Sequence, residues 1–242
     1  MPQKHSIKTY VLDGIYHIYN RGVEKRLIFI EDQDYHVFLN LLKESLLPHE
    51  RLQQLCQDDT LTNKRRKDRP PKNFCNSIQL LAYCLMPNHF HCMIKQCDAH
   101  SLDKFIKTLC TRYSMYINKK YKRVGTLFQG AYKAVLISEE PYFLHLSRYI
   151  HRNPIGLFPH LEKAYSSYAD YLGVRHTEWL HAESILSLFQ QEKLPFLKNT
   201  TTYRSFVESS DQQSTWMDGI TLENEDDDDN TGFDIDRYRR QL

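Results

Sequence analysis

The stretch Met86-Pro87-Asn88-His89-Phe90-His91-Cys92-Met93-Ile94 places two histidines on either side of one apolar residue, inside an apolar run typical of a β-strand. Successive side chains of a strand point to opposite faces, so we expect His89 and His91 to share one face. Their imidazoles would lie roughly 6–7 Å apart along the strand. They could bind one metal ion if a third ligand came from elsewhere in the chain. Taken alone, the pattern is more typical of two ordinary strand histidines.

Strands and helices alternate on both sides of this stretch. The two apolar segments 77–86 and 89–95 around Pro87-Asn88 are either one bent strand or two, because proline disfavours an uninterrupted central strand. The spacing of apolar residues elsewhere predicts a strand at 13–22, helices at 33–46, 101–120, 140–152 and 178–192, and extended structure within 124–137. This order favours an α+β fold, an antiparallel sheet with helices packed on one face.

The predicted helix 140–152 begins with Ser138-Glu139-Glu140-Pro141, a serine cap followed by acids and a proline in the first turn. It should end near Arg152, because the residue before Pro154 is pushed out of the α region. Tyr149 and Asn153 are four residues apart and therefore share a helical face. The Asn153 carbonyl could be the third metal ligand beside His89 and His91, with Tyr149 one turn away.

Charge divides the chain into a basic body and an acidic end. From Glu223 onward there are eight acids and three arginines, a net charge of −5, which leaves +7 on the other 222 residues of a chain whose total is +2. A basic body favours a polyanionic partner, and the acidic end either screens that surface or only solubilises the protein. We expect one domain over residues 1–207 with an exposed basic insertion at about 48–76, followed by a disordered acidic tail over 208–242.

Cysteine usage and hydropathy place the chain in the cytoplasm. The six cysteines are scattered without CxxC pairs, which favours free thiols over a zinc site at Cys92 and Cys97. No apolar run approaches the ~18 residues that span a bilayer, and the first residues lack the apolar core of a signal peptide. We therefore expect no membrane partner.

Five motifs occur in the order found in the single-tyrosine (Y1) transposases of the HUH class, and the chain especially resembles their REP-associated branch. Together they cover roughly residues 10–172. The motifs are Tyr16-His17-Ile18-Tyr19-Asn20-Arg21-Gly22, Met86-Pro87-Asn88-His89-Phe90-His91, Gly125-Thr126-Leu127-Phe128-Gln129-Gly130-Ala131-Tyr132-Lys133, Arg148-Tyr149-Ile150-His151-Arg152-Asn153-Pro154 and Ser166-Ser167-Tyr168.

The resemblance implies a ferredoxin-like sheet with both histidines on a central strand, and a transposase that works on hairpin-bearing single-stranded DNA. Tyr149 would attack a phosphodiester, leaving a 5′-phosphotyrosine and a free 3′-hydroxyl. His89, His91 and Asn153 would hold Mg²⁺ or Mn²⁺. Relatives act as monomers or as dimers, and the protein would be nucleoid-associated when bound to DNA. The insertion at 48–76, the acidic tail and Ala131, where many relatives carry arginine, depart from the family pattern.

The chemistry of these residue types suits that reaction. A tyrosyl phosphodiester stores the energy of the broken bond, and a phenolate leaves more readily than an alkoxide, so a 3′-hydroxyl can reverse the step. A phenol of pKa about 10 is a poor nucleophile at neutral pH, and a divalent cation offsets the charge that develops on phosphate. Two imidazoles and an amide carry no charge, so we expect weak metal binding without DNA. These donors alone would suggest zinc or manganese.

Several basic and polar side chains are candidate DNA contacts, although an exposed solubilising role is as common for each of them. Among the other tyrosines, Tyr113 and Tyr116 are expected in the core, whereas Tyr121 and Tyr132 could lie in a DNA groove. We assign no role to His151. The candidate DNA contacts are Arg21, Arg112, Lys119, Lys120, Arg123, Gln129, Lys133, Arg148 and Arg152.

Two other functions are compatible with the sequence. The first is a domesticated, non-catalytic protein that binds hairpin DNA and regulates. The second is a metal-dependent hydrolase that uses a metal-bound water, with Tyr149 structural. The presence of the tyrosine and all three candidate ligands favours the transesterase.

Overall fold

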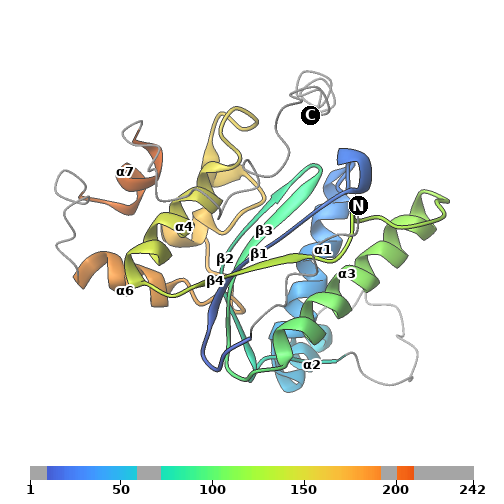
Figure 1. The fold of residues 1–242 in the computed structure, drawn as a ribbon, viewed down its shortest axis with the longest axis horizontal. Coiled ribbons are helices and arrows are strands. Elements are labelled where there is room, and N and C mark those ends of the chain that lie inside the picture. The colour runs from blue at the N-terminus through green and yellow to red at the C-terminus, as the bar shows by residue number, and fades with distance from the viewer. Residues whose placement is uncertain (1–9, 59–71, 192–200, 210–242) are drawn as a thin grey trace, which may run out of the picture.

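The computed structural model describes residues 10–58, 72–191 and 201–209 (Figure 1). Two 3₁₀ turns, Val23–Lys25 and Leu161–Lys163, accompany the helices and strands. The strands are β1 (Ile15–Arg21), β2 (Ile78–Met86), β3 (His89–Gln96) and β4 (Lys133–Ile137). The helices are α1 (Asp32–Leu46), α2 (His49–Asp58), α3 (Ser101–Lys120), α4 (Glu140–Arg152), α5 (Tyr168–Tyr171), α6 (Glu183–Gln191) and α7 (Tyr203–Glu208).

The four strands form one antiparallel sheet in the order β2-β3-β1-β4. With α1 between β1 and β2, and α3 between β3 and β4, this is the ferredoxin-like arrangement of two split βαβ units. Pro87 and Asn88 form the turn between two separate strands, and the Pro87 carbonyl accepts hydrogen bonds from the backbone N–H groups of Ile28 and Phe29. The predicted α+β class and ferredoxin-like sheet are confirmed, and β3 is a central strand.

Helices α1 and α3 pack on one face of the sheet, where the main aromatic core lies. The Phe90 ring of β3 lies 5.3 Å from that of Phe38 in α1, which in turn lies 5.0 Å from the ring of Tyr113 in α3. The buried Tyr113 hydroxyl donates to the carbonyl of Ile28 at 2.6 Å. This is the helical layer that the sequence predicts.

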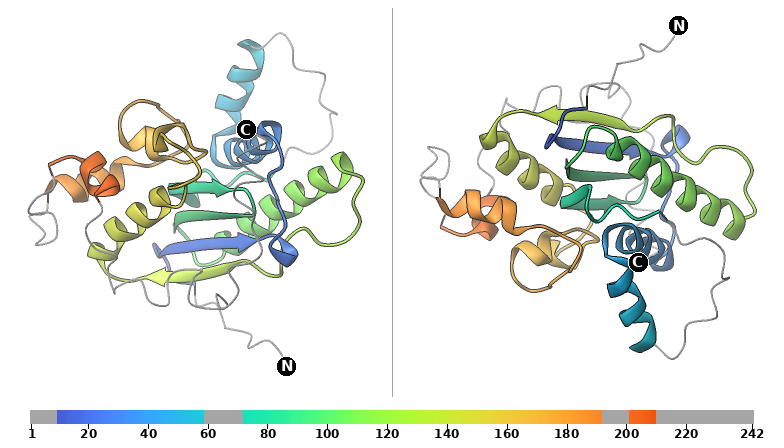
Figure 2. Two further views of the ribbon diagram at one scale, coloured as in Figure 1. Left: turned by 90° about the horizontal axis from the view of Figure 1, so that it is seen from above. Right: turned by 90° about the horizontal axis from the view of Figure 1, so that it is seen from below.

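Helix α4 covers the opposite face, so helices pack on both faces of the sheet (Figure 2). The sequence analysis expected helices packed on one face of the sheet; α1 and α3 form that layer, and α4 adds a cover on the opposite face. The reason lies in β3, where neighbouring residues point to opposite faces and both Phe90 and His91 are completely buried. A strand that buries both faces needs a cover on each of them.

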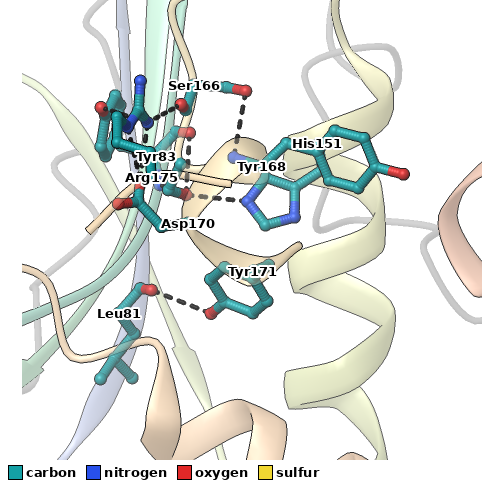
Figure 3. A network of polar contacts seen from close by, with 9 residues as sticks. Leu81, Tyr83, His151, Ser166, Tyr168, Asp170, Tyr171 and Arg175 are labelled. Atoms are coloured by element: carbon teal, nitrogen blue, oxygen red, sulfur yellow. Dashed lines mark hydrogen bonds and ion pairs between the residues drawn. The ribbon is translucent and has the colours of Figure 1, made fainter. Parts of the chain in front are cut away.

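The segment that follows α4 is fastened to β2 by a polar network (Figure 3). Arg175 donates to the Asp170 carboxylate at 2.6 Å, to the Ser166 carbonyl at 2.5 Å and to the Tyr83 hydroxyl at 3.2 Å. The Tyr171 hydroxyl donates to the carbonyl of Leu81 at 2.9 Å. These bonds hold the layer containing α4 and α5 against the edge of the sheet.

Several predicted boundaries shift. The cap of α4 is Glu139, not Ser138, and its side chain makes no capping hydrogen bond, because β4 extends to Ile137 and Ser138 serves as the link between strand and helix. The helix expected at 178–192 begins later, at Glu183. Part of the basic insertion forms α2, and residues 59–71 lie outside the described residues.

The described fold continues past the expected domain boundary at 207, because α7 and Ser209 pack on α4. Of the predicted disordered tail over residues 208–242, residues 210–242 lie outside the described residues. Among the described helices, none is long and apolar enough to cross a membrane.

Candidate active site

Alternate residues of β1 and β3 place polar side chains on the face of the sheet beneath α4. Tyr19 pairs with His91, and Arg21 pairs with His89, in the antiparallel register of these strands. Directly paired residues project to the same face. Lys133 of β4 pairs with Tyr19 on its other side. The strand period predicted from the sequence thus brings both histidines to one face.

His91 is completely buried, and its two ring nitrogens have different surroundings. Its Nδ1 lies 2.9 Å from Nε2 of His17 on β1. Its Nε2 has no hydrogen-bond partner among the described residues. Burial, with smaller contributions from His89, His17 and Arg21, holds the pKa of His91 well below its usual value. The imidazole is therefore neutral, with an unused nitrogen, as a metal ligand must be.

His89 is half-buried, and its ring is nearly perpendicular to that of His91, with centroids 4.9 Å apart. The Asn88 amide nitrogen donates to the carbonyl of Lys25, so Asn88 Oδ1 accepts from His89 Nδ1 at 2.6 Å. Burial and the nearby Arg21 lower the pKa of His89 to about 4, while a hydrogen bond with Asn153 opposes this shift. His89 is therefore neutral at physiological pH and in contact with Asn153.

Helix α4 brings Tyr149 over the histidines. The Tyr149 ring stands nearly perpendicular to those of His91 and His17, at centroid distances of 5.4 and 5.9 Å. Asn153 ends the helix, and both its backbone N–H and its side-chain Nδ2 donate to the Tyr149 carbonyl, at 3.1 and 3.0 Å. The amide oxygen of Asn153 is then the atom available to a ligand.

The donor set His89, His91 and Asn153 fits a divalent metal ion. The buried and unpartnered His91 Nε2 supplies one donor, and His89 and Asn153 are already in contact. No trio of His, Cys, Asp or Glu side chains converges on a metal-sized site in the described part of the chain, so the amide would have to complete the set. All three donors are uncharged, which leaves an approaching anion to balance the metal charge.

Three of the predicted DNA contacts border this face. Arg21 is half-buried, its Nε has no hydrogen-bond partner among the described residues, and its charge contributes to the lowered pKa values of both site histidines. The Lys133 ammonium lies 5.9 Å from the Tyr19 ring centroid. Gln129 is exposed, and its backbone N–H donates to the carbonyl of Arg21.

The predicted contacts on α3 and the loop after it do not gather at this site. Arg112 forms a 2.6 Å ion pair with Glu44 of α1, and Lys120 binds the buried Asp34 at 2.6 Å. Lys119 is exposed on the same helix. In the loop after α3, Arg123 donates weakly to Asn118 at 3.4 Å. A DNA-binding role for these four residues stays a prediction, in a region separate from the histidines.

Arg148 and Arg152 point from α4 to the end of α7. Arg148 donates to the carbonyls of Phe206 and Ser209, and Arg152 donates to those of Val207 and Ser209, at 2.6–2.8 Å. The last carbonyls of a helix lack intrahelical partners, and cations stabilise them. In this structure both arginines therefore cap α7. Their predicted contact with DNA has no support from their position.

The structure adds His17 and Tyr19 to the site, although the sequence analysis assigned them no role. Both alternate with Arg21 on β1, and that spacing was visible in the sequence, but the pairing of β1 with β3 was not. Burial raises the pKa of the Tyr19 hydroxyl. The other tyrosines considered lie elsewhere, because Tyr121 and Tyr132 donate to Asp34 and Asp103.

A ferredoxin-like sheet that carries paired histidines beneath a tyrosine-bearing helix defines a candidate nucleic-acid-processing site. Comparison with known families gives a match over part of the chain. Residues 71–153, which contain both strand histidines, Tyr149 and Asn153, match the family described as "Transposase IS200 like". This match spans 83 of the 242 residues.

Solved structures and curated proteins were also compared. A REP-associated tyrosine transposase bound to a REP hairpin is 11% identical with a TM-score of 0.49, covering 73% of this chain and 96% of that one. A Deinococcus radiodurans R1 protein, described as a candidate transposase, is 14% identical with a TM-score of 0.34, covering 63% of this chain and 97% of that one. No curated protein matches the sequence.

Proposed function

We propose that this protein is a transposase that nicks and rejoins single-stranded DNA at hairpin-associated sites through a covalent 5′-phosphotyrosine on Tyr149. The observation that carries the proposal is the position of Tyr149, whose ring packs 5.4 Å from that of His91 on the face that also bears His89. The proposed nucleophile and the proposed metal donors come from β3 and from α4 with its C-terminal cap, and they meet on one face of the sheet.

In the proposed step, the Tyr149 hydroxyl oxygen forms a bond to the scissile phosphorus while the bond from phosphorus to the 3′ oxygen breaks. The phenolic proton is released, and the departing 3′ oxygen takes up a proton to become a free hydroxyl. The number of phosphodiester bonds is unchanged, so a 3′-hydroxyl can reverse the reaction and join a new strand without another energy source.

His89, His91 and the Asn153 carbonyl would hold Mg²⁺ or Mn²⁺. When bound, the ion would supply charge neutralisation for the phosphate, which the uncharged donors cannot provide. Arg21 and Lys133 would bind the DNA backbone beside it. The neutral imidazoles favour metal binding at physiological pH, because a protonated histidine cannot act as a ligand.

Hairpin DNA is part of the proposal because the motif order resembles the REP-associated branch. Recognition of bases that flank a stem needs backbone contacts together with exposed groups that reach unpaired bases. Gln129 is exposed and bonded through its backbone to the strand that carries Arg21, which suits it to a base contact at the edge of the site.

An adduct assay tests the proposal. Purified protein is incubated with end-labelled hairpin DNA from the flanks of its gene and Mn²⁺ or Mg²⁺, then run on denaturing gels. We expect a labelled protein band that is lost with chelator and in Tyr149→Phe. Tyr132→Phe is a matched control, which keeps the band because the Tyr132 hydroxyl donates to Asp103, away from the histidines.

Other outcomes would identify the rival functions. Hairpin binding without adduct or cleavage would favour a regulatory DNA-binding protein. Cleavage that survives Tyr149→Phe would indicate hydrolysis by water. An adduct that is lost in Tyr19→Phe but retained in Tyr149→Phe would move the nucleophile to β1.

A further inference from the structure

We infer that His17 is a positioning residue that holds His91 in the tautomer with its proton on Nδ1. In this tautomer the lone pair of His91 Nε2 is directed into the site. The inference rests on the proposed function in taking that lone pair as a metal donor, but the tautomer itself can be measured without any metal.

The first observation is the contact itself. His17 Nε2 and His91 Nδ1 lie 2.9 Å apart, a hydrogen-bond distance, and both side chains are completely buried. One of the two nitrogens must carry the proton, and the other must accept it.

The second observation fixes the direction of the bond. If His17 donated, His91 would carry its proton on Nε2, where the described structure offers no acceptor. A buried N–H group without an acceptor is unfavourable. If His91 donates through Nδ1, its Nε2 is a bare lone pair, which is the state needed for a metal donor. The geometry therefore favours His91 as donor and His17 as acceptor.

The third observation is that His17 is held in place. Its ring lies nearly parallel to that of His91, with an interplanar angle of 18° and a centroid distance of 5.1 Å. The rings of Tyr19 and Tyr149 lie 5.0 and 5.9 Å away on other sides. The acceptor nitrogen thus has little freedom to turn away, so His17 orients the His91 ring as well as its proton.

The inference distinguishes two substitutions of similar size. Glutamine places an amide oxygen at about the position of the histidine Nε2, so His17→Gln keeps an acceptor for His91. His17→Phe fills the same space without any acceptor. A purely structural role would be served at least as well by phenylalanine as by glutamine, whereas a positioning role is served by glutamine alone.

The direct test is a long-range ¹H–¹⁵N correlation spectrum of ¹⁵N-histidine-labelled protein in chelator, with the His91 signals assigned by their loss in His91→Gln. We expect His91 as the Nδ1–H tautomer in the wild type and in His17→Gln, and a shift toward the Nε2–H tautomer in His17→Phe. An Nε2–H tautomer in the wild type would overturn the inference. So would an unchanged tautomer in a folded His17→Phe protein.

Metal affinity gives the second readout, measured by electron paramagnetic resonance as Mn²⁺ is titrated in the presence of single-stranded DNA, in a Tyr149→Phe background that blocks cleavage. We expect about ten- to hundredfold weaker Mn²⁺ binding in His17→Phe, with recovery in His17→Gln and no change in His176→Gln, an exposed control. Thermal melting of each variant identifies misfolding. If His17→Phe does not fold, His17→Ala takes its place as the variant without an acceptor. Equal Mn²⁺ affinity in folded His17→Gln and His17→Ala would then overturn the inference.

The two measurements separate this inference from the proposed function. If the wild-type spectrum shows the Nδ1–H tautomer but Mn²⁺ does not bind, the metal site fails while the histidine pair stands. If Mn²⁺ binds and the tautomer is Nε2–H, the role of His17 fails while the metal site stands.

Discussion

At the scale of single residues, the three proposed metal donors are all uncharged. His91 and His89 are neutral because their surroundings disfavour the imidazolium form, and Asn153 contributes an amide where many metal sites have a carboxylate. Nearby Arg21 adds positive charge. As the proposed ligands, such a set would hold a dication weakly until an anion such as a DNA phosphate arrived, which would couple metal binding to substrate binding.

Adding one negative charge should remove this dependence. In Asn153→Asp, a carboxylate replaces the amide at the same position. We expect Mn²⁺ binding without DNA to strengthen by about tenfold or more, because a unit charge near the ion contributes about 1–4 kcal/mol. Electron paramagnetic resonance titration of Mn²⁺ measures the change. Asn118→Asp, on the other side of the sheet, is the control and should leave affinity unaltered. Equal affinities for Asn153→Asp and wild type would exclude Asn153 as a ligand.

At the scale of elements, α4 is held between the sheet and α7. His151 of α4 is completely buried, with its Nδ1 2.8 Å from the Tyr203 hydroxyl and its Nε2 2.8 Å from Ser167 Oγ. The Tyr203 hydroxyl also donates to Ser147 at 2.9 Å. Together with the two arginine caps, these bonds make α7 a support for the helix that carries Tyr149.

The arginine caps give a prediction about α7. Replacing Arg148 and Arg152 with glutamine removes the charged donors from the helix end, and we expect faster amide hydrogen exchange across residues 203–208, by about five- to thirtyfold for a loss of 1–2 kcal/mol. Hydrogen–deuterium exchange read by mass spectrometry measures this. Lys119→Gln, an exposed change on α3, is the control.

DNA affinity measured on the same arginine variants decides between capping and DNA contact. Capping predicts altered exchange in α7 and a small effect on DNA binding. Unaltered exchange together with a large loss of DNA affinity would show that both arginines contact DNA, as the sequence analysis predicted.

The start of α3 gives a pH-dependent prediction. Asp98 accepts hydrogen bonds from the backbone N–H groups of His100 and Ser101 and from the Ser101 hydroxyl, which lower its pKa to about 2. Since the folded pKa lies below the unfolded value of about 3.9, this stabilisation is complete above that value and is lost as pH falls toward 2. We expect Asp98→Ala to cost about 1 kcal/mol at pH 7 and less at pH 3, measured by urea unfolding. A cost that does not shrink at pH 3 would contradict this account.

Much of this element structure could be predicted from periodicity, because the apolar stripes of α1 and α3 and the alternation of β1 and β3 reflect which faces are buried. The site could be predicted only in part. The spacing of Tyr149 and Asn153 shows that they share a helical face, but no local pattern shows that this face lies over His17. The spacing of charges likewise cannot reveal that Lys120 binds Asp34 or that Arg148 caps a helix nearly sixty residues later, because those partners are set by tertiary packing.

At the scale of the whole molecule, charge is distributed unevenly along the chain. The residues before Glu223 carry +7, and those from Glu223 onward carry −5. A basic protein attracts DNA over distances set by ionic strength, and an acidic segment on the same chain competes with DNA for the basic surface.

A truncated protein should reveal that competition. We expect a variant ending at Leu222 to bind single-stranded DNA about two- to tenfold more tightly than the full chain at low salt, with the difference vanishing near 0.5 M salt because both attractions are screened. Fluorescence anisotropy across a salt series measures it. Replacing the acids after Leu222 with their amides should reproduce the gain. A truncated protein of unchanged affinity would assign the acidic segment to solubility alone.

The packing of Tyr149 on the histidines of its own chain limits the stoichiometry of the reaction. With Tyr149 as the proposed nucleophile, each polypeptide would contribute one nucleophile to one sheet, and it could be joined to one broken DNA end at a time. Moving a DNA segment requires that two ends be released and rejoined. One molecule would therefore have to act in successive rounds, with the first junction resealed before the second is cut, whereas two molecules could hold both ends at once. Dilution distinguishes these schemes, since the yield of rejoined product falls with protein concentration only when two molecules must meet.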